Sequence, residues 1–467
     1  MKKILFIILS LALFASCDRK IDKFAASANG VDFSKFVSVG NSMTAGYADG
    51  ALSLTGQTYS IPNIMATQFK SVGGGEFKQP LLGTTDGVGF QPVPGGIYCY
   101  TKMVLKLGAD KDCWGNPTGT VSMKPGFVSN PDQATLLGQL FAPPTVTGPY
   151  NNMGVPGATL MTLFYPGYGS AFGNPYFTRF ATSPATTMLT DAVVQQPTFF
   201  YLWIGNNDAL ASALAGTDMM MTPADTFAKY YPMAVGALLA SGRTPKGVLG
   251  TIPYVTSLPF FTTISKQLPW NGVPLDATLA AQLNGLYALQ GHPEIVWKAG
   301  LNPFVYKKED GTLAQMAEGD EFLLTLPTDS IKCRGMGIVD TTKHPLPYIY
   351  PIPGKYILTK SEQANINQRI FEYNQVIKLV ASSQKLALAD MNAYLPQFES
   401  GITFDGISMS TTFVTGGMFS TDGIHLNPRG NSVAANFFIQ AINSKYGCTI
   451  PQADVTKFPG LLFPNKP

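Results

Sequence analysis

Short apolar runs alternate with stretches of helical spacing along most of the chain. Short runs that are mostly apolar predict strands at residues 36–39, 247–252 and 386–389, and the continuous apolar and aromatic run at 198–204 is typical of a strand buried on both faces. Helical signals lie near residues 61–69, 183–195, 222–241, 359–380 and 427–446. This alternation predicts an α/β fold in which a central parallel sheet carries helices on both faces.

Local signals mark the starts of two of these helices. Thr359 and Glu362 have capping-box spacing. The apolar residues that follow recur at steps of four and three and predict one buried stripe: Ile366, Ile370, Tyr373, Ile377 and Val380. Asn427 and Pro428 suit the N-cap and first position of the last helix.

Two segments do not follow the pattern. Residues 51–149 and 253–358 are rich in Gly, Pro and aromatic residues and show little periodicity. They are predicted to be long, loop-rich insertions within one domain that spans residues 32–467. The second insertion could form a lid or a wall of a substrate site.

The chain begins with two lysines and an apolar run from Ile4 to Ala15. This run is shorter than the ~20 residues that span a bilayer, so it predicts a signal peptide, residues 1–16. Ala15-Ser16-Cys17 resembles the lipobox of bacterial lipoproteins, in which the cysteine is acylated. We expect an exported protein anchored through Cys17 and a tether, residues 17–31, to a cell-envelope membrane, with the outer membrane or cell surface favoured. An ordinary signal peptide with a chance cysteine is the alternative.

Composition changes this picture little. Charged residues make up 13% of the chain, aromatic residues 12%, and the formal net charge is +3 without a basic run. This argues against nucleic acid as a partner. The oligomeric state is not indicated.

Four cysteines follow Cys17, an even number that suggests two disulfides in an exported protein. We favour Cys99–Cys113, which are close in sequence, leaving Cys333–Cys448. Three connectivities exist, and free buried thiols are the alternative. No Cys/His cluster has the spacing of a zinc site.

Ser42 is the first candidate for chemistry. The run Phe36–Val39 stops at Gly40, and Ser42 lies in the turn before a helix-compatible segment. Nucleophilic serines are often held at such a sheet edge, although serine is also an ordinary turn and N-cap residue.

His425 is the best candidate for the base that a serine nucleophile needs. It lies in Asp422-Gly423-Ile424-His425, just before the last helix, whereas His292 and His344 lie in the second insertion. A carboxylate three residues before the histidine can reach Nδ1 across a turn and fix the tautomer. A polar turn without catalytic function is the alternative.

Two further turns could supply donors to an oxyanion. Gly205-Asn206-Asn207-Asp208 follows the central apolar run, and an Asn side chain there can donate an N–H. The Gly154–Gly157 turn can contribute a backbone N–H. Ordinary Asn/Gly turns are the alternative.

Four segments, in order, resemble the blocks of the SGNH (GDSL-type) hydrolase family. Gly40-Asn41-Ser42-Met43 resembles G-D-S-L, residues 152–157 resemble N-x-G-x-x-G, residues 205–208 resemble G-x-N-D, and residues 422–425 resemble D-x-x-H. The resemblance covers about half the chain and leaves both insertions unexplained. Asn41 stands where the family usually has Asp.

The resemblance implies a flavodoxin-like three-layer α/β/α sandwich and a serine ester hydrolase. Ser42 would be the nucleophile, His425 the base and Asp422 its orienting acid. The Ser42 and Gly157 N–H groups and the Asn207 side chain would form the oxyanion hole, without metal or cofactor. Acyl lipids and O-acetylated carbohydrates are the two substrate classes, and a catalytically silent lipoprotein that binds glycan or lipid is the alternative function.

Overall fold

The computed structural model describes residues 25–461, apart from 242, 244, 341 and 343–346. Its centre is a five-stranded sheet whose paired strands all run parallel. The strands are β1 (Phe36–Gly40), β6 (Asn152–Gly154), β7 (Phe199–Trp203), β8 (Lys246–Gly250) and β18 (Ala387–Ala389).

The spatial order of the strands is β6-β1-β7-β8-β18. Numbered along the chain, this is the flavodoxin-like order 2-1-3-4-5. The two central strands β1 and β7 are buried at every position, as expected from their apolar runs. The α/β fold class predicted from the sequence is therefore confirmed.

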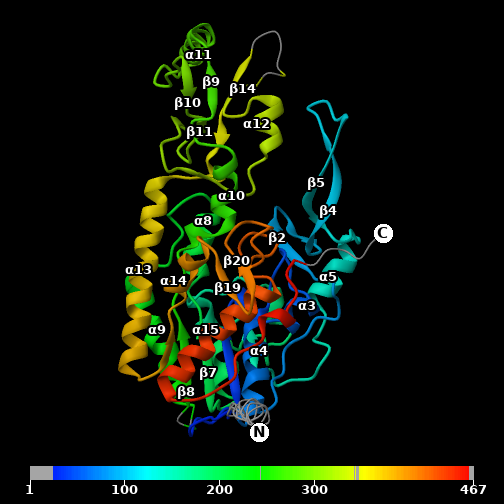
Figure 1. The fold of residues 1–467 in the computed structure, drawn as a ribbon, viewed down its shortest axis with the longest axis vertical. Coiled ribbons are helices and arrows are strands. Elements are labelled where there is room, and N and C mark those ends of the chain that lie inside the picture. Colours follow the sequence, from blue (N-terminus) through cyan, green and yellow to red (C-terminus); the bar gives the residue numbers. More distant parts are fainter. Residues whose placement is uncertain (1–24, 242, 244, 341, 343–346, 462–467) are drawn as a thin grey trace, which may run out of the picture.

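Helices cover both faces of the sheet (Figure 1). On one face α4 (Ile61–Phe69) packs against α15 (Pro428–Tyr446), which also contacts β8 and β18. On the other face α9 (Ala224–Leu239) packs against both α7 (Met188–Val193) and α13 (Lys360–Ser383). The result is three layers, with the carboxyl ends of the strands free to carry functional loops.

Two of the predicted helix starts are confirmed at the predicted residues. Thr359 and Glu362 form a reciprocal capping box at α13, and the whole predicted stripe of that helix is buried. Asn427 caps α15, with Pro428 as its first residue. By contrast, α7 begins only after Thr187, because the Thr187 side chain accepts the Thr190 N–H and sets the N-terminus there.

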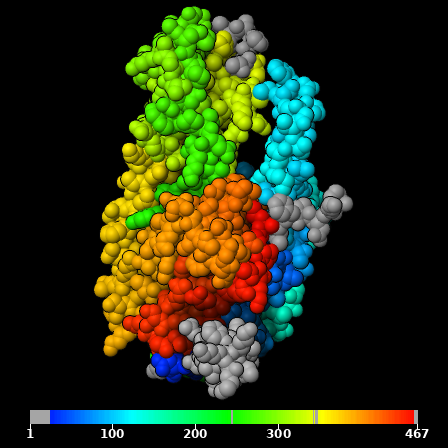
Figure 2. All heavy atoms as spheres, in the orientation of Figure 1, coloured from blue at the N-terminus to red at the C-terminus, as the bar shows by residue number. Residues whose placement is uncertain are grey.

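The first insertion carries short elements of its own. They are α3 (Leu54–Thr58), η1 (Lys70–Val72), β2 (Gly89–Val93), β3 (Gly96–Tyr100), β4 (Met103–Lys111), β5 (Pro117–Phe127) and α5 (Gln133–Phe141), together with α4. Strands β4 and β5 pair as an antiparallel hairpin that stands out from the body of the molecule (Figure 2).

The second insertion has a separate small hydrophobic core, built around the buried aromatic residues Tyr287, Trp297, Phe304 and Phe322. Its elements are η3 (Val255–Ser257), α10 (Pro259–Gln267), β9 (Val273–Leu275), α11 (Ala277–Leu289), β10 (Gly300–Asn302), β11 (Val305–Lys307), β12 (Leu313–Gln315), β13 (Glu321–Phe322), α12 (Thr328–Arg334), β14 (Ile338–Asp340), β15 (Tyr348–Tyr350), β16 (Ile352–Pro353), η4 (Gly354–Tyr356) and β17 (Ile357–Leu358). Helices α11 and α12 and strands β9, β10, β11 and β14 of this insertion lie in the upper part of Figure 1.

Short elements complete the strand ends and the C-terminal part. They are α2 (Ser42–Ala45), η2 (Met161–Phe164), α6 (Pro175–Thr178), α8 (Asn207–Leu214), α14 (Met391–Tyr394), η5 (Leu395–Phe398), β19 (Ile402–Phe404), β20 (Ile407–Met409) and η6 (Val455–Lys457).

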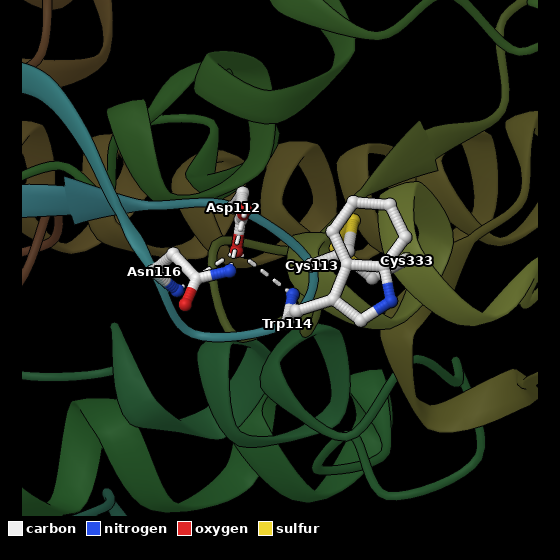
Figure 3. Close-up of a disulfide and its surroundings, with 5 residues drawn as sticks. All are labelled: Asp112, Cys113, Trp114, Asn116 and Cys333. Atoms are coloured by element: carbon white, nitrogen blue, oxygen red, sulfur yellow. Dashed lines mark hydrogen bonds between the residues drawn. A yellow bond between two sulfur atoms is a disulfide. The ribbon is translucent and has the colours of Figure 1, made fainter.

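The predicted disulfide pairing is wrong. One disulfide joins Cys113, at the tip of the β4–β5 hairpin, to Cys333 on α12, so it ties the two insertions together (Figure 3). Cys99 and Cys448 are buried free thiols, and burial raises the pKa of both. Cys99 lies on β3, and β4 then carries Cys113 to the far end of the hairpin. Cys448 instead donates to the Ala28 carbonyl, 3.1 Å away.

The hairpin tip is held by Asp112. Its carboxylate accepts the backbone N–H groups of Trp114 at 2.9 Å and Asn116 at 2.8 Å (Figure 3).

The predicted signal peptide and Cys17 lie outside the described residues. Within residues 25–461, leaving aside the short gaps, no helix is long and apolar enough to cross a membrane.

Candidate active site

Ser42 lies where β1 gives way to α2. A side chain at Gly40 would place Cβ 2.1 Å from Thr44 Oγ1 and 2.6 Å from the Trp203 carbonyl oxygen, so only glycine allows this tight turn. Asn41 then caps α2, since its Oδ1 accepts the Met43 N–H at 3.1 Å. These contacts hold Ser42 at the carboxyl edge of the sheet, with its side chain almost buried.

His425 and Asp422 come from the loop that connects β20 to α15, and this loop reaches the same edge. The Ser42 Oγ lies 2.9 Å from His425 Nε2, and His425 Nδ1 lies 2.9 Å from Asp422 Oδ2. The three side chains thus form a continuous series of hydrogen bonds between residues 380 positions apart. Such a series can move a proton from the serine hydroxyl to the imidazole.

Asp422 is held as a carboxylate. Its Oδ1 accepts the backbone N–H groups of Ile424 at 2.9 Å and His425 at 2.8 Å, and its Oδ2 also accepts the Gly50 N–H at 3.0 Å. Burial alone would raise the pKa of Asp422, but the His425 imidazole and the N–H donors outweigh it and lower the pKa to about 2. Asp422 is therefore a carboxylate at neutral pH.

Gly157 and Asn207 lie on two neighbouring turns. Gly157 has φ +83°, in a turn closed by the Ala158 N–H on the Val155 carbonyl at 3.0 Å. Asn207, at the start of α8, donates from Nδ2 to the Ala158 carbonyl at 2.9 Å, so the two turns are bonded to each other. Within the described part of the chain, the Ser42 and Gly157 N–H groups have no protein acceptor. Their roles as oxyanion donors stay predictions.

Asn41, where the resembled family usually has Asp, performs two tasks. In addition to capping α2, its Nδ2 donates to Asn206 Oδ1 at 3.1 Å. An aspartate could serve as the cap but could not donate to Asn206. The amide thus joins the Ser42 turn to the turn that carries Asn207.

Sequence reasoning missed Asp49, which lies seven positions after Ser42. Its backbone N–H donates to Ser420 Oγ at 3.0 Å, and its Oδ1 accepts both N–H and O–H from Thr421 at 3.0 and 2.9 Å. Burial raises the pKa of Asp49, and the nearby charge of Asp422 adds to the effect. Asp49 therefore fastens the loop that carries Asp422 and His425 to the segment that carries Ser42.

Tyr47 was missed as well. Its ring packs against the His425 imidazole with centroids 4.9 Å apart, and its hydroxyl donates to the Gly50 carbonyl. The only sequence signal for both residues is their position directly after the Ser42 turn. Nothing local indicates that they contact a loop about 370 residues away.

The remaining histidines are not part of this site. His292 is hydrogen-bonded to Glu294 in the second insertion, and His344 lies outside the described residues. Among the residues that the structure describes, no group of three or more His, Cys, Asp or Glu side chains is arranged to hold a metal ion.

Comparison with known proteins adds little to this description. No protein-family model matches the chain, and no curated protein matches its sequence. Among solved structures it is similar to the lipase/acylhydrolase from Enterococcus faecalis, at 12% identity and a TM-score of 0.26, over 64% of this chain and 77% of that chain. This score is too low to relate the two sites.

Proposed function

We propose that the protein is a serine ester hydrolase. The observation that carries the proposal is the buried series Ser42–His425–Asp422, with 2.9 Å at each step, beside an apolar cavity. A serine with a purely structural role needs no histidine at hydrogen-bond distance. Nor does it need that histidine to be bonded to a carboxylate that four N–H groups hold in place.

The reaction follows from the proton positions. Ser42 Oγ forms a bond to the acyl carbon while its proton passes to His425 Nε2, and Asp422 stabilises the resulting imidazolium. The Ser42 and Gly157 N–H groups and the Asn207 side chain would stabilise the oxyanion. Collapse breaks the ester C–O bond as His425 protonates the leaving alcohol. Water, deprotonated by His425, then releases the acid from Ser42.

The test is Ser42→Ala, with Ser432→Ala as the matched control. Ser432 is also buried, on α15, and its hydroxyl donates to the Arg429 carbonyl at 2.7 Å. We expect Ser42→Ala to abolish hydrolysis of p-nitrophenyl butyrate without loss of thermal stability, and Ser432→Ala to retain the activity. Full activity in Ser42→Ala would refute the proposal. Binding of a glycan or lipid by a wild-type protein that hydrolyses no ester would favour the silent binding protein.

We also propose that the protein is exported and anchored to a cell-envelope membrane through Cys17. The support is the sequence of residues 1–17 alone. In a bacterial host, Cys17→Ala should move the protein from the membrane fraction to the soluble fraction. An unchanged membrane fraction would contradict the anchor.

A further inference from the structure

A cavity of about 70 Å³ opens beside the candidate nucleophile. Ser42 and His425 both line it, as do Asn41, Asn206 and Asn207. The other lining residues are aliphatic, sulfur-containing or aromatic and include Trp203, Leu210, Met391, Leu395, Phe398 and Phe437. Polar groups therefore occur in this cavity only where the ester bond would be cleaved, apart from the Tyr394 side chain.

The apolar walls are preformed. Trp203 ends β7, and its indole N–H donates to the Thr251 carbonyl at 2.9 Å, which leaves only its carbon surface for the cavity. Tyr394 stacks on Phe437 with centroids 3.7 Å apart, and Phe398 packs edge-on against Phe437 at 6.2 Å. These contacts join α14, η5 and α15 into one wall at the carboxyl ends of β7, β8 and β18.

We infer that this cavity binds the acyl chain of the ester, and that the substrate carries an acyl chain of medium length. The inference rests on the proposed function. A hydrocarbon chain gains free energy from every methylene that it buries, whereas the hydroxyl groups of a sugar would lack partners on these walls. An acetyl group would leave most of the cavity unfilled.

The volume sets the chain length. A water-sized group occupies about 10–15 Å³ of such space, so the cavity of about 70 Å³ holds roughly five to seven groups. Esters of hexanoic to octanoic acid, which carry five to seven carbons beyond the carbonyl, match this number. Acyl lipids with chains of this size fit the site, and O-acetylated carbohydrates do not.

The experiment compares p-nitrophenyl acetate, butyrate, hexanoate, octanoate and decanoate. Each buried methylene is worth about 0.8 kcal/mol, so we expect kcat/KM to rise about fourfold per methylene up to hexanoate. The rise should end between hexanoate and octanoate. A maximum at acetate, or a flat profile, would overturn the inference.

A pair of methionine variants tests the location of the acyl chain. Met391→Ala enlarges the cavity, whereas Met65→Ala removes the same atoms from the core under α4, away from the cavity. The optimum should move to a longer chain in Met391→Ala and stay in place in Met65→Ala. Leu210→Ala, on α8, is the second cavity variant.

The outcomes separate the two proposals. If Met391→Ala and Leu210→Ala both keep the wild-type optimum while hydrolysis depends on Ser42, the acyl site is refuted and the hydrolase stands. If the wild-type protein hydrolyses none of the five esters, the proposed function fails, and the acyl site fails with it.

Discussion

Replacing Asp422 by Asn changes one atom in the hydrogen-bond series and should inactivate the protein. The carboxylate accepts four N–H groups, two on each oxygen. An amide can accept on only one side. If its oxygen faces the Ile424 and His425 backbone donors, its NH₂ faces His425 Nδ1 and the Gly50 N–H.

That orientation leaves one donor, the partly buried Gly50 N–H, without a partner, whereas the flipped amide would leave both the Ile424 and His425 N–H groups without one. An unsatisfied buried donor costs about 1–3 kcal/mol, so the first orientation is favoured and the variant loses about that much stability. Its NH₂ donates to Nδ1, which forces the proton of the neutral imidazole onto Nε2. His425 then cannot accept the Ser42 proton, and a reversed tautomer lowers kcat on the order of 10⁴-fold in serine proteases.

The assay is kcat for p-nitrophenyl hexanoate at neutral pH, with thermal unfolding of the same samples. Asp132→Asn is the control, because Asp132 caps α5 outside the site and asparagine caps equally well. The control should match the wild type in both measurements. A kcat of Asp422→Asn within tenfold of wild type would refute the tautomer argument.

Three further predictions follow from single features. Gly157→Ala should lower the free energy of unfolding by about 1 kcal/mol, because alanine is strained at φ +83°. Its kcat should fall on the order of 10²-fold, because the backbone N–H would shift from the proposed oxyanion position, while KM should change little. The double variant Cys113→Ser, Cys333→Ser should exchange amide hydrogens faster in residues 103–127 but not in β7, since the disulfide joins only the insertions; equally fast exchange in β7 would contradict this. The pKa of Asp422 is about 2 in the folded protein against 3.8 in an unfolded chain, so its carboxylate contributes about 2 kcal/mol of stability above about pH 4, which is lost as the pH falls through about 2. Urea unfolding between pH 5 and pH 2 should show wild type and Asp422→Asn converging by that amount, and a constant difference would exclude it.

Local signals predicted the parts of the fold that local chemistry decides. The capping box of α13, the Asn427 cap of α15 and the apolar runs of β1 and β7 depend on neighbours within four residues, so the sequence shows them directly. The disulfide depends on the path of a hairpin. Proximity along the chain favoured Cys99 for Cys113, but β4 carries Cys113 away from it toward α12.

The cavity beside Ser42 could not be predicted for the same reason. Its wall combines the end of β7 with α14, η5 and α15, which are separated by up to about 230 residues, and the short segment 391–398 shows no periodicity that marks it. Ser42, Asp422 and His425 could be proposed because two short motifs held all three. Asp49 could not, since its partners Ser420 and Thr421 lie about 370 positions away.

The contacts of Asp49 and Gly50 explain how such large insertions can coexist with a fixed arrangement of Ser42, His425 and Asp422. The Gly50 N–H donates to Asp422, and the Asp49 carboxylate accepts the Thr421 N–H. The segment that follows Ser42 is therefore hydrogen-bonded directly to the loop that carries His425. Together with the Ser42–His425 hydrogen bond these contacts close a small ring. Both insertions contact this ring from outside: the Met103 N–H, at the start of the β4–β5 hairpin, donates to the Asp49 carbonyl, and the Phe260 N–H of the second insertion donates to the Gly423 carbonyl. Changes in either insertion should therefore alter substrate access and chain-length preference, measured as KM, before they alter the distance between Ser42 Oγ and His425 Nε2.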